Sequence, residues 1–142
     1  MRRLILLAAT AALLSACEGN FVAPQDGEQQ TWEYTAYDFN NVAVVEGTFI
    51  VRAEGRDLTG SWETTLLKPN AEVGPQVGTG ELRGSWDVEG QSLFLDMNPG
   101  WADNNVFLVA TPDGTNRLKG NWSHSTLTGV RTGGQFTAKK AG

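Results

Sequence analysis

The chain has 142 residues, of which 40% are hydrophobic, and its 16 Asp and Glu outnumber its 11 Lys and Arg for a formal net charge of −5. This length favours a single domain with a hydrophobic core of its own. The acidic balance, with the basic residues scattered along the sequence, argues against nucleic acid and anionic lipid headgroups as partners, because both require a basic surface that neutralises phosphate.

The first residues have the pattern of a signal peptide. Arg2 and Arg3 precede an apolar stretch over 4–14. This stretch is too short for a membrane-spanning helix, which needs about 20 residues, but it suits the core of a signal peptide. Removing Arg2 and Arg3 with the leader leaves nine basic residues against 16 acidic ones, a formal charge of −7.

Cys17 follows two small residues and is the only cysteine, so it has no partner for an internal disulfide. The run 14–17, Leu-Ser-Ala-Cys, resembles the bacterial lipobox. That resemblance implies a signal peptide over 1–16, acylation of Cys17 by chains such as palmitate, and anchoring in the lipid bilayer of a bacterial cell envelope. An ordinary secretory signal with a cysteine near its cut is the alternative. By the same family pattern, Glu18 favours the outer over the inner membrane.

Residues 17–30 contain glycine, proline and little periodicity, which predicts a lipidated cysteine followed by a flexible tether. From 31 to 140, short alternating runs separated by turns predict one all-β domain. Eight strands are expected, over 31–39, 43–53, 57–66, 79–88, 91–97, 105–111, 116–123 and 131–140. Three connections are short turns with glycine, which predict antiparallel hairpins. The longer connections are expected at 67–78, 98–104 and 124–129. Closure into an up-and-down barrel would remove the exposed edges.

A motif Leu-x-Gly-x-Trp occurs at 58–62, 82–86 and 118–122. Because residues two apart share one face of a strand, its Leu, Gly and Trp should face the interior. The residues expected to face outward are Ser61, Ser85 and Asn121. The three glycines predict either a bend that helps the sheet to close or room for a bulky side chain from across the core.

The tryptophans have two interpretations. Trp32, Trp62, Trp86 and Trp122 either line a ligand cavity or fill the core of the barrel. In a simple meander, Trp62 and Trp122 should lie toward one end and Trp86 toward the other. The sixth strand, 105–111, is apolar on both faces, so the alternation leaves its buried face open.

The region 31–140 resembles the calycin group of small β-barrels, which includes lipocalins and avidins. Within it, 48–51 with 58–63 are similar to the second hairpin of streptavidin, and 125–129 with 136–137 to its last hairpin. The resemblance implies an eight-stranded barrel. The first strand lacks the Asn and Ser pair of the avidin site, and Arg131 stands where an acid is expected, so tight biotin binding is not expected.

Catalytic chemistry is sparse, and no enzyme activity is expected. His124, the only histidine, lies in a predicted loop without a recognisable orienting carboxylate or oxyanion hole, so an exposed loop histidine is the preferred interpretation. One histidine and one acylated cysteine leave no expected metal cluster, and the Asp and Asn runs at 103–105 and 113–116 lack EF-hand spacing. The glycines at 78–84 do not have dinucleotide-site spacing, and no cofactor is expected.

Two functions remain for a membrane-anchored barrel. The preferred hypothesis is binding of a small apolar or amphipathic ligand. The alternative is a non-enzymatic structural or protein-interaction module with a filled core, whose protein partner the sequence does not specify. An internal void of a few hundred Å³ would favour the first hypothesis.

Overall fold

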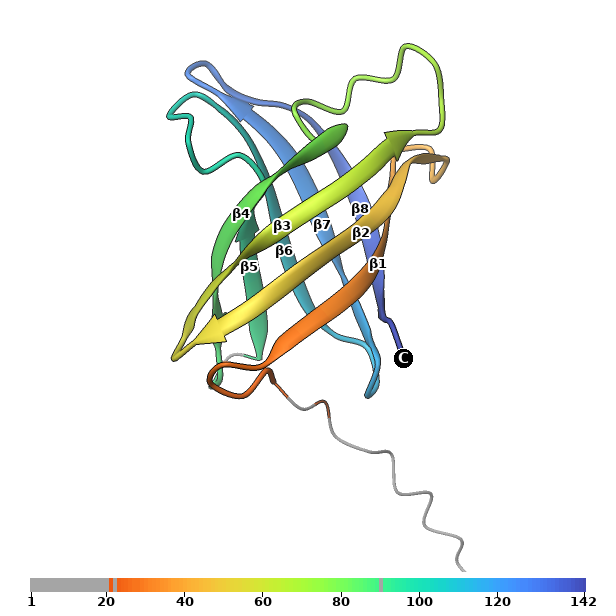
Figure 1. Cartoon of the computed structure of the whole chain (residues 1–142). Coiled ribbons are helices and arrows are strands. Elements are labelled where there is room, and N and C mark those ends of the chain that lie inside the picture. The colour runs from red at the N-terminus through yellow and green to blue at the C-terminus, as the bar shows by residue number, and fades with distance from the viewer. Residues whose placement is uncertain (1–20, 22, 90) are drawn as a thin grey trace, which may run out of the picture.

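A computed structural model describes residues 21, 23–89 and 91–142. Eight strands form a closed antiparallel barrel in which each strand pairs with its sequence neighbours and the last strand pairs with the first (Figure 1). The strands are β1 (Gln29–Tyr37), β2 (Ala43–Glu54), β3 (Asp57–Leu66), β4 (Gly78–Asp87), β5 (Ser92–Asp96), β6 (Asn104–Pro112), β7 (Arg117–Thr126) and β8 (Gly129–Lys140). The all-β, up-and-down barrel predicted from the sequence is confirmed. No helix in the described part of the chain is long and apolar enough to cross a membrane.

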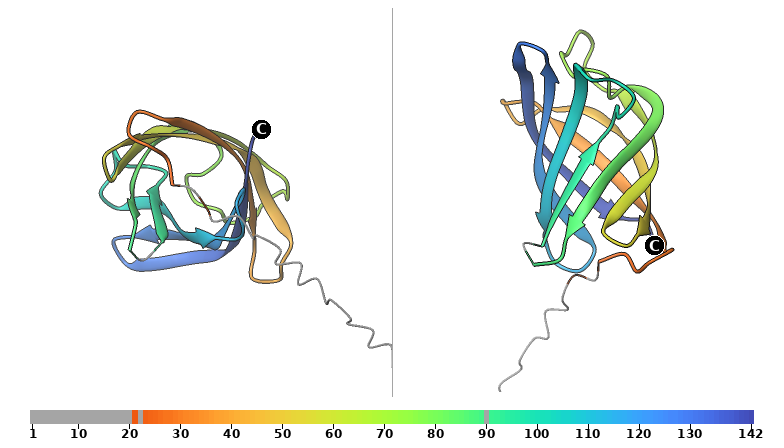
Figure 2. Two further views of the ribbon diagram at one scale, coloured as in Figure 1. Left: turned by 90° about the horizontal axis from the view of Figure 1, so that it is seen from below. Right: turned by 90° about the vertical axis from the view of Figure 1, so that its left-hand side faces the viewer.

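The two ends of the barrel differ in what they carry. One end, which we call the base, holds the turns β2–β3, β4–β5 and β6–β7, together with residues 23–28 and the C-terminus. The other end, which we call the rim, holds the connections β1–β2, β3–β4, β5–β6 and β7–β8 (Figure 1). Viewed from the base, the strands form a complete ring (Figure 2). The chain therefore enters and leaves the barrel at the same end.

Strand boundaries match the predicted ranges closely except at two places. β1 begins at Gln29, inside the predicted tether. The loop predicted over 124–129 is wrong, because Thr126 pairs with Gly129 and only two residues separate β7 from β8. Gly129 has a φ of 103°, which permits this tight turn. The Ser and Thr residues that suggested a loop pair through their backbone instead.

The repeated motif faces inward as predicted. Its leucines and tryptophans are buried, and Ser61, Ser85 and Asn121 are exposed. Trp62 lies in the rim half of β3 and Trp86 at the base end of β4, as the meander requires.

The glycines of the motif allow the backbones of neighbouring strands to lie very close together. A Cβ at Gly60, Gly84 or Gly120 would lie only 1.7–1.8 Å from a carbonyl oxygen of the neighbouring strand. Such contacts let strongly bent strands close into a small barrel. Gly80, outside the motif position, makes room for an aromatic ring, because a Cβ there would meet Trp62 at 2.5 Å; Trp62 is its partner on the adjacent strand and not a side chain from across the core.

The open question about β6 is settled by its burial. Val106, Leu108 and Ala110 are buried and face the interior. Phe107 and Val109 face outward, and the Phe107 ring stacks on the exposed Phe94 of β5 at 5.5 Å. The apolar character of both faces thus reflects a buried inner face and an aromatic stack on the outer wall.

Candidate functional site

The interior of the barrel, where a ligand was expected, is filled by side chains. Trp32 and Trp122 are each 2% exposed, and Trp62 and Trp86 are each 6% exposed. The rings pack on one another, with the centroid of Trp32 6.4 Å from that of Phe49 and the centroid of Tyr34 5.5 Å from that of Phe136. Together with the large interior residues on β1, β2 and β8, the four tryptophans therefore form a packed core, as in many small barrels.

The base is closed by the chain segment that precedes β1. Phe21 packs against the core, with its ring centroid 5.0 Å from that of Trp86 and 6.1 Å from that of Trp32. The segment turns inward across the base (Figure 2), where Gly27 N–H donates to Ala53 O at 2.8 Å. The final part of the predicted tether is therefore part of the domain.

The rim end is closed by the β3–β4 connection. Val73 and Gln76 are buried there, and Gln76 Oε1 accepts a hydrogen bond from the Tyr34 hydroxyl at 2.7 Å. Burial raises the pKa of Tyr34 far above its usual range, so this hydroxyl stays protonated and donates. Gln76 Nε2 donates to Val73 O at 2.8 Å, and Thr64 Oγ1 donates to Gln76 O. Gln76 thus joins the connection to the barrel by hydrogen bonds to Tyr34 of β1 and Thr64 of β3, and its bond to Val73 lies within the connection.

His124 is not the exposed loop residue that was expected. It lies in β7, is half-buried, and its Nε2 is 2.8 Å from Asn104 Oδ1. Its ring also contacts the β3–β4 connection, since a Cβ at Gly74 would lie 2.5 Å from the ring. The extension of β7 to Thr126 places His124 on the inward-facing side, where it packs between the β3–β4 connection and the start of β6.

Exposed apolar side chains gather at the rim. Of the described large hydrophobic residues that are exposed, eight belong to the rim connections or the adjoining strand ends, and Val88 is the one at the base. The eight are Phe39, Val42, Leu66, Leu67, Val77, Trp101, Leu127 and Val130. All four rim connections contribute. Single exposed apolar residues are ordinary, but a group at one end marks an interaction surface.

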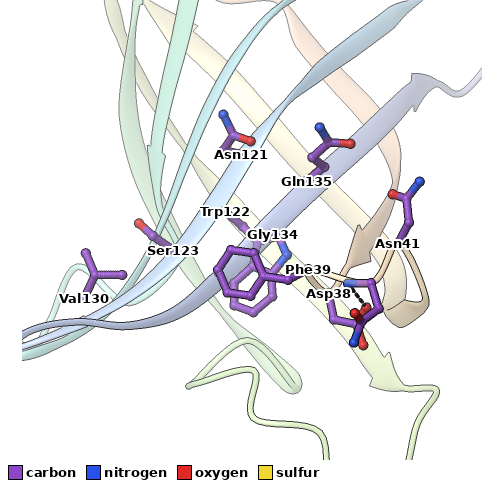
Figure 3. A pocket seen from close by; sticks show the side chains of 11 residues that line it. Asp38, Phe39, Asn41, Asn121, Trp122, Ser123, Val130, Gly134 and Gln135 are labelled. Carbon is purple, nitrogen blue, oxygen red and sulfur yellow. Dashed lines mark hydrogen bonds between the residues drawn. The ribbon is translucent and has the colours of Figure 1, made fainter.

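A groove lies on the outer wall of β7 and β8, beneath the β1–β2 connection (Figure 3). Its rim-side part has a volume of about 680 Å³ and its base-side part about 600 Å³. The two parts share three amide residues, Asn41, Asn121 and Gln135. Asn121 and Gln135 are direct cross-strand partners, and Figure 3 shows both projecting from the same side of the wall.

The β1–β2 connection that overhangs this groove is fixed by Asp38. Its Oδ1 accepts the backbone N–H of Asn40 at 2.9 Å and of Val42 at 3.0 Å, and its Oδ2 lies 3.4 Å from Lys68 Nζ. The Val42 N–H is the main cause that holds the Asp38 pKa below its usual range, so the group is ionised at neutral pH. These bonds position Phe39, 80% exposed, at the rim end of the groove.

The fold also separates charges that are scattered along the sequence. β7 and β8 contain no Asp or Glu, and their five basic residues are Arg117, Lys119, Arg131, Lys139 and Lys140. Carboxylates concentrate on the wall of β1 to β4 instead, at Glu33, Glu46, Glu54, Asp57, Glu63, Glu81 and Asp87. The face that carries the groove is therefore locally basic in an acidic protein.

The groove residues were not singled out from the sequence. Strand alternation correctly placed Asn121 on the outer face, but its pairing with Gln135 depends on the register of β7 and β8. Within residues 21, 23–89 and 91–142, no three His, Cys, Asp or Glu side chains come together as a candidate metal site. The predicted signal peptide over 1–16 and the predicted lipidation site Cys17 lie outside the described residues.

Comparisons with known proteins give no relative from which a function could be inferred, so the function is inferred from the fold and its surface. No protein-family model matches the chain, and neither the curated proteins nor the solved structures give a significant match.

Proposed function

We propose that the chain is an exported bacterial lipoprotein, anchored in the outer membrane through acylated Cys17, whose barrel is a non-enzymatic binding module for a protein of the cell envelope. The filled interior is the observation that carries this choice. A barrel that carries a small apolar ligand in its centre needs a void of about 300–1,000 Å³. Here the central tryptophans Trp32 and Trp122 are each 2% exposed. Binding is therefore assigned to the outer surface.

The rim supports this function by its position and its composition. Its apolar side chains stand on four separate connections, at the end opposite to the segment that leads back to Cys17. One of the few charges there, Asp38, is paired with Lys68. Protein interfaces have apolar, charge-poor centres of this kind.

If the protein also binds a small ligand, the site lies on the outer wall of the barrel and not in its filled interior. The rim-side part of the groove, at about 680 Å³, has the volume of a small-molecule site. It is the one observation that favours a small ligand as a second binding partner.

Anchoring is tested by Cys17→Ser. We expect the variant to move from the membrane fraction to the soluble fraction, because two or three acyl chains at about 0.8 kcal/mol per buried methylene are lost. Detergent-phase partitioning and intact mass give the readout. Glu18→Gln, which keeps the cysteine, should stay with the membrane. An unmodified Cys17 thiol in mature, soluble wild-type protein would contradict the anchor.

The rim is tested by photo-crosslinking in intact cells. A photoreactive residue at Trp101 or Leu127 should give a discrete adduct with a protein, because these side chains are 63% and 83% exposed on the rim. The matched control is Val88, which is 60% exposed at the base. Equal adducts from both ends, or none from the rim, would refute the rim as the interface.

A further inference from the structure

We propose that the groove on β7 and β8 is a binding site for an anionic glycan, which adjoins the proposed protein interface at the rim and shares Phe39 and Val130 with it. Paired side chains on this wall change in character from the rim toward the base. The pairs, in that order, are Ser123 with Gly133, Asn121 with Gln135, Lys119 with Thr137, and Arg117 with Lys139. From the rim toward the base, the wall thus presents first a pair of small residues, then a pair of amide side chains, and then the cations.

The amides select a ligand rich in hydroxyl groups. A primary amide presents both donors and acceptors, and a sugar hydroxyl is likewise both, so each can satisfy the other. Asn41, Asn121 and Gln135 all line both parts of the groove, so three amides meet at its centre. None of the three side chains has a hydrogen-bond partner among the described residues. Their polar groups face solvent and are free to bind a ligand.

The rim end of the groove supplies an apolar surface. Phe39 is 80% exposed and Val130 is 68% exposed, and both line the groove, where Phe39 lies near Gly134 (Figure 3). The C–H face of a pyranose packs well on such an aromatic ring. The two adjacent glycines of this wall serve close packing of the backbone, since a Cβ at Gly134 would lie 1.9 Å from Tyr37 O and one at Gly133 2.6 Å from Trp122 O.

The base end supplies positive charge. Lys119 lines the base-side part, and Arg117 and Lys139 face each other one pair further on. Lys139 also faces Glu33 of β1 across the other ladder, so Lys119 and Arg117 are the two cations of β7 left for an anionic ligand. Asp113 lies 3.8 Å from Lys119, but both side chains are more than half exposed, so this ion pair is weak. A carboxylate or sulfate on the ligand would therefore find a basic surface.

The closed barrel disfavours a peptide in the same groove. β7 pairs with β6 and β8, and β8 pairs with β7 and β1, so neither strand has a free edge that could accept an added strand. The wall offers side chains rather than backbone groups. Side-chain amides, an aromatic ring and cations fit a glycan better than an extended peptide.

The test uses the full chain with Cys17→Ser, so that the anchor plays no part in the result. Hyaluronate hexasaccharide is the anionic probe, and chitohexaose is a neutral probe of the same length. We expect saturable binding of hyaluronate, at least fivefold weaker binding of chitohexaose, and loss of this difference at high salt. The NMR signal of the Trp122 indole N–H, which donates to Tyr37 O at 2.8 Å beneath the groove, should shift, while that of Trp86 at the base should not.

Two variants separate the parts of the site. Asn121→Ala with Gln135→Ala should weaken both probes at least tenfold, whereas Lys119→Gln with Arg117→Gln should weaken hyaluronate alone. Ser61→Ala with Glu81→Gln, an outward-facing cross-strand pair on the opposite wall, should change neither. The proposal is overturned if neither probe saturates, if the Trp122 signal does not move, or if the Ser61 and Glu81 variant weakens binding equally. It is also overturned if only anionic lipid vesicles bind, and none of these results bears on crosslinking at the rim.

Discussion

Replacement of Trp122 by alanine is expected to lower the free energy of unfolding by about 3–5 kcal/mol. The side chain is 2% exposed in the middle of the barrel, and its indole N–H donates to the Tyr37 carbonyl at 2.8 Å. The substitution removes this large ring from a packed core and leaves the carbonyl without its donor. Chemical denaturation followed by far-UV circular dichroism gives the difference.

The control is the adjacent residue on the opposite face of the same strand. Asn121 is exposed, and Asn121→Ala should change the free energy of unfolding by no more than about 0.5 kcal/mol. Equal losses from the two variants would mean that β7 does not have one buried and one exposed face, which would contradict the barrel.

Replacement of Gly60 by alanine is the second change with a large expected effect. The added Cβ would lie 1.7 Å from Ile50 O and 2.8 Å from Ile50 C, which are backbone atoms of the paired strand. Relief of this clash requires β2 and β3 to separate, so we expect a loss of about 3 kcal/mol or more, at the upper end for overpacking. Thermal and chemical unfolding measure it, and a failure to fold is the extreme form of the same result.

Gly100→Ala is the matched control. Gly100 lies in the β5–β6 connection, where no heavy atom beyond its chain neighbours lies within 4 Å of an added Cβ, so the change should be within about 0.5 kcal/mol. A Gly60→Ala variant as stable as the control would show that the strands do not approach as closely as the barrel requires.

The barrel could be predicted because the patterns that specify its strands and turns lie within short stretches of the sequence. Alternation of period two assigned Trp62 and Trp122 to the interior, and glycine turns set the antiparallel order of the strands. The hairpin at 125–129 was indicated by the resemblance to streptavidin, but its two-residue turn was missed because its Ser and Thr residues have the composition of a longer loop. The role of Phe21 was missed because a single aromatic residue in an aperiodic segment carries no pattern. Its contact with Trp86 depends on the closed shape of the whole domain.

The candidate site is less visible in the sequence because its residues come together only on closure. Phe39 and Asn41 come from the β1–β2 connection, and Asn121 and Gln135 from β7 and β8. They become neighbours because β8 pairs with β1 and because a bulge between His124 and Ser125 sets the register of the last hairpin. The basic face arises in the same way, since its charges are spread over more than 20 residues of sequence.

The position of Phe21 in the base limits how far the domain can move from a membrane. Only three residues, 18–20, separate Phe21 from Cys17. If Cys17 is acylated as proposed, the chain between it and Phe21 spans at most about 14 Å, at roughly 3.5 Å per residue step. A barrel wall of ten-residue strands tilted by about 40° adds roughly 25 Å. The rim would then be held no more than about 40 Å above the bilayer. A partner would have to meet the rim within this shallow layer, which excludes any role that requires the domain to cross the space between two distant membranes.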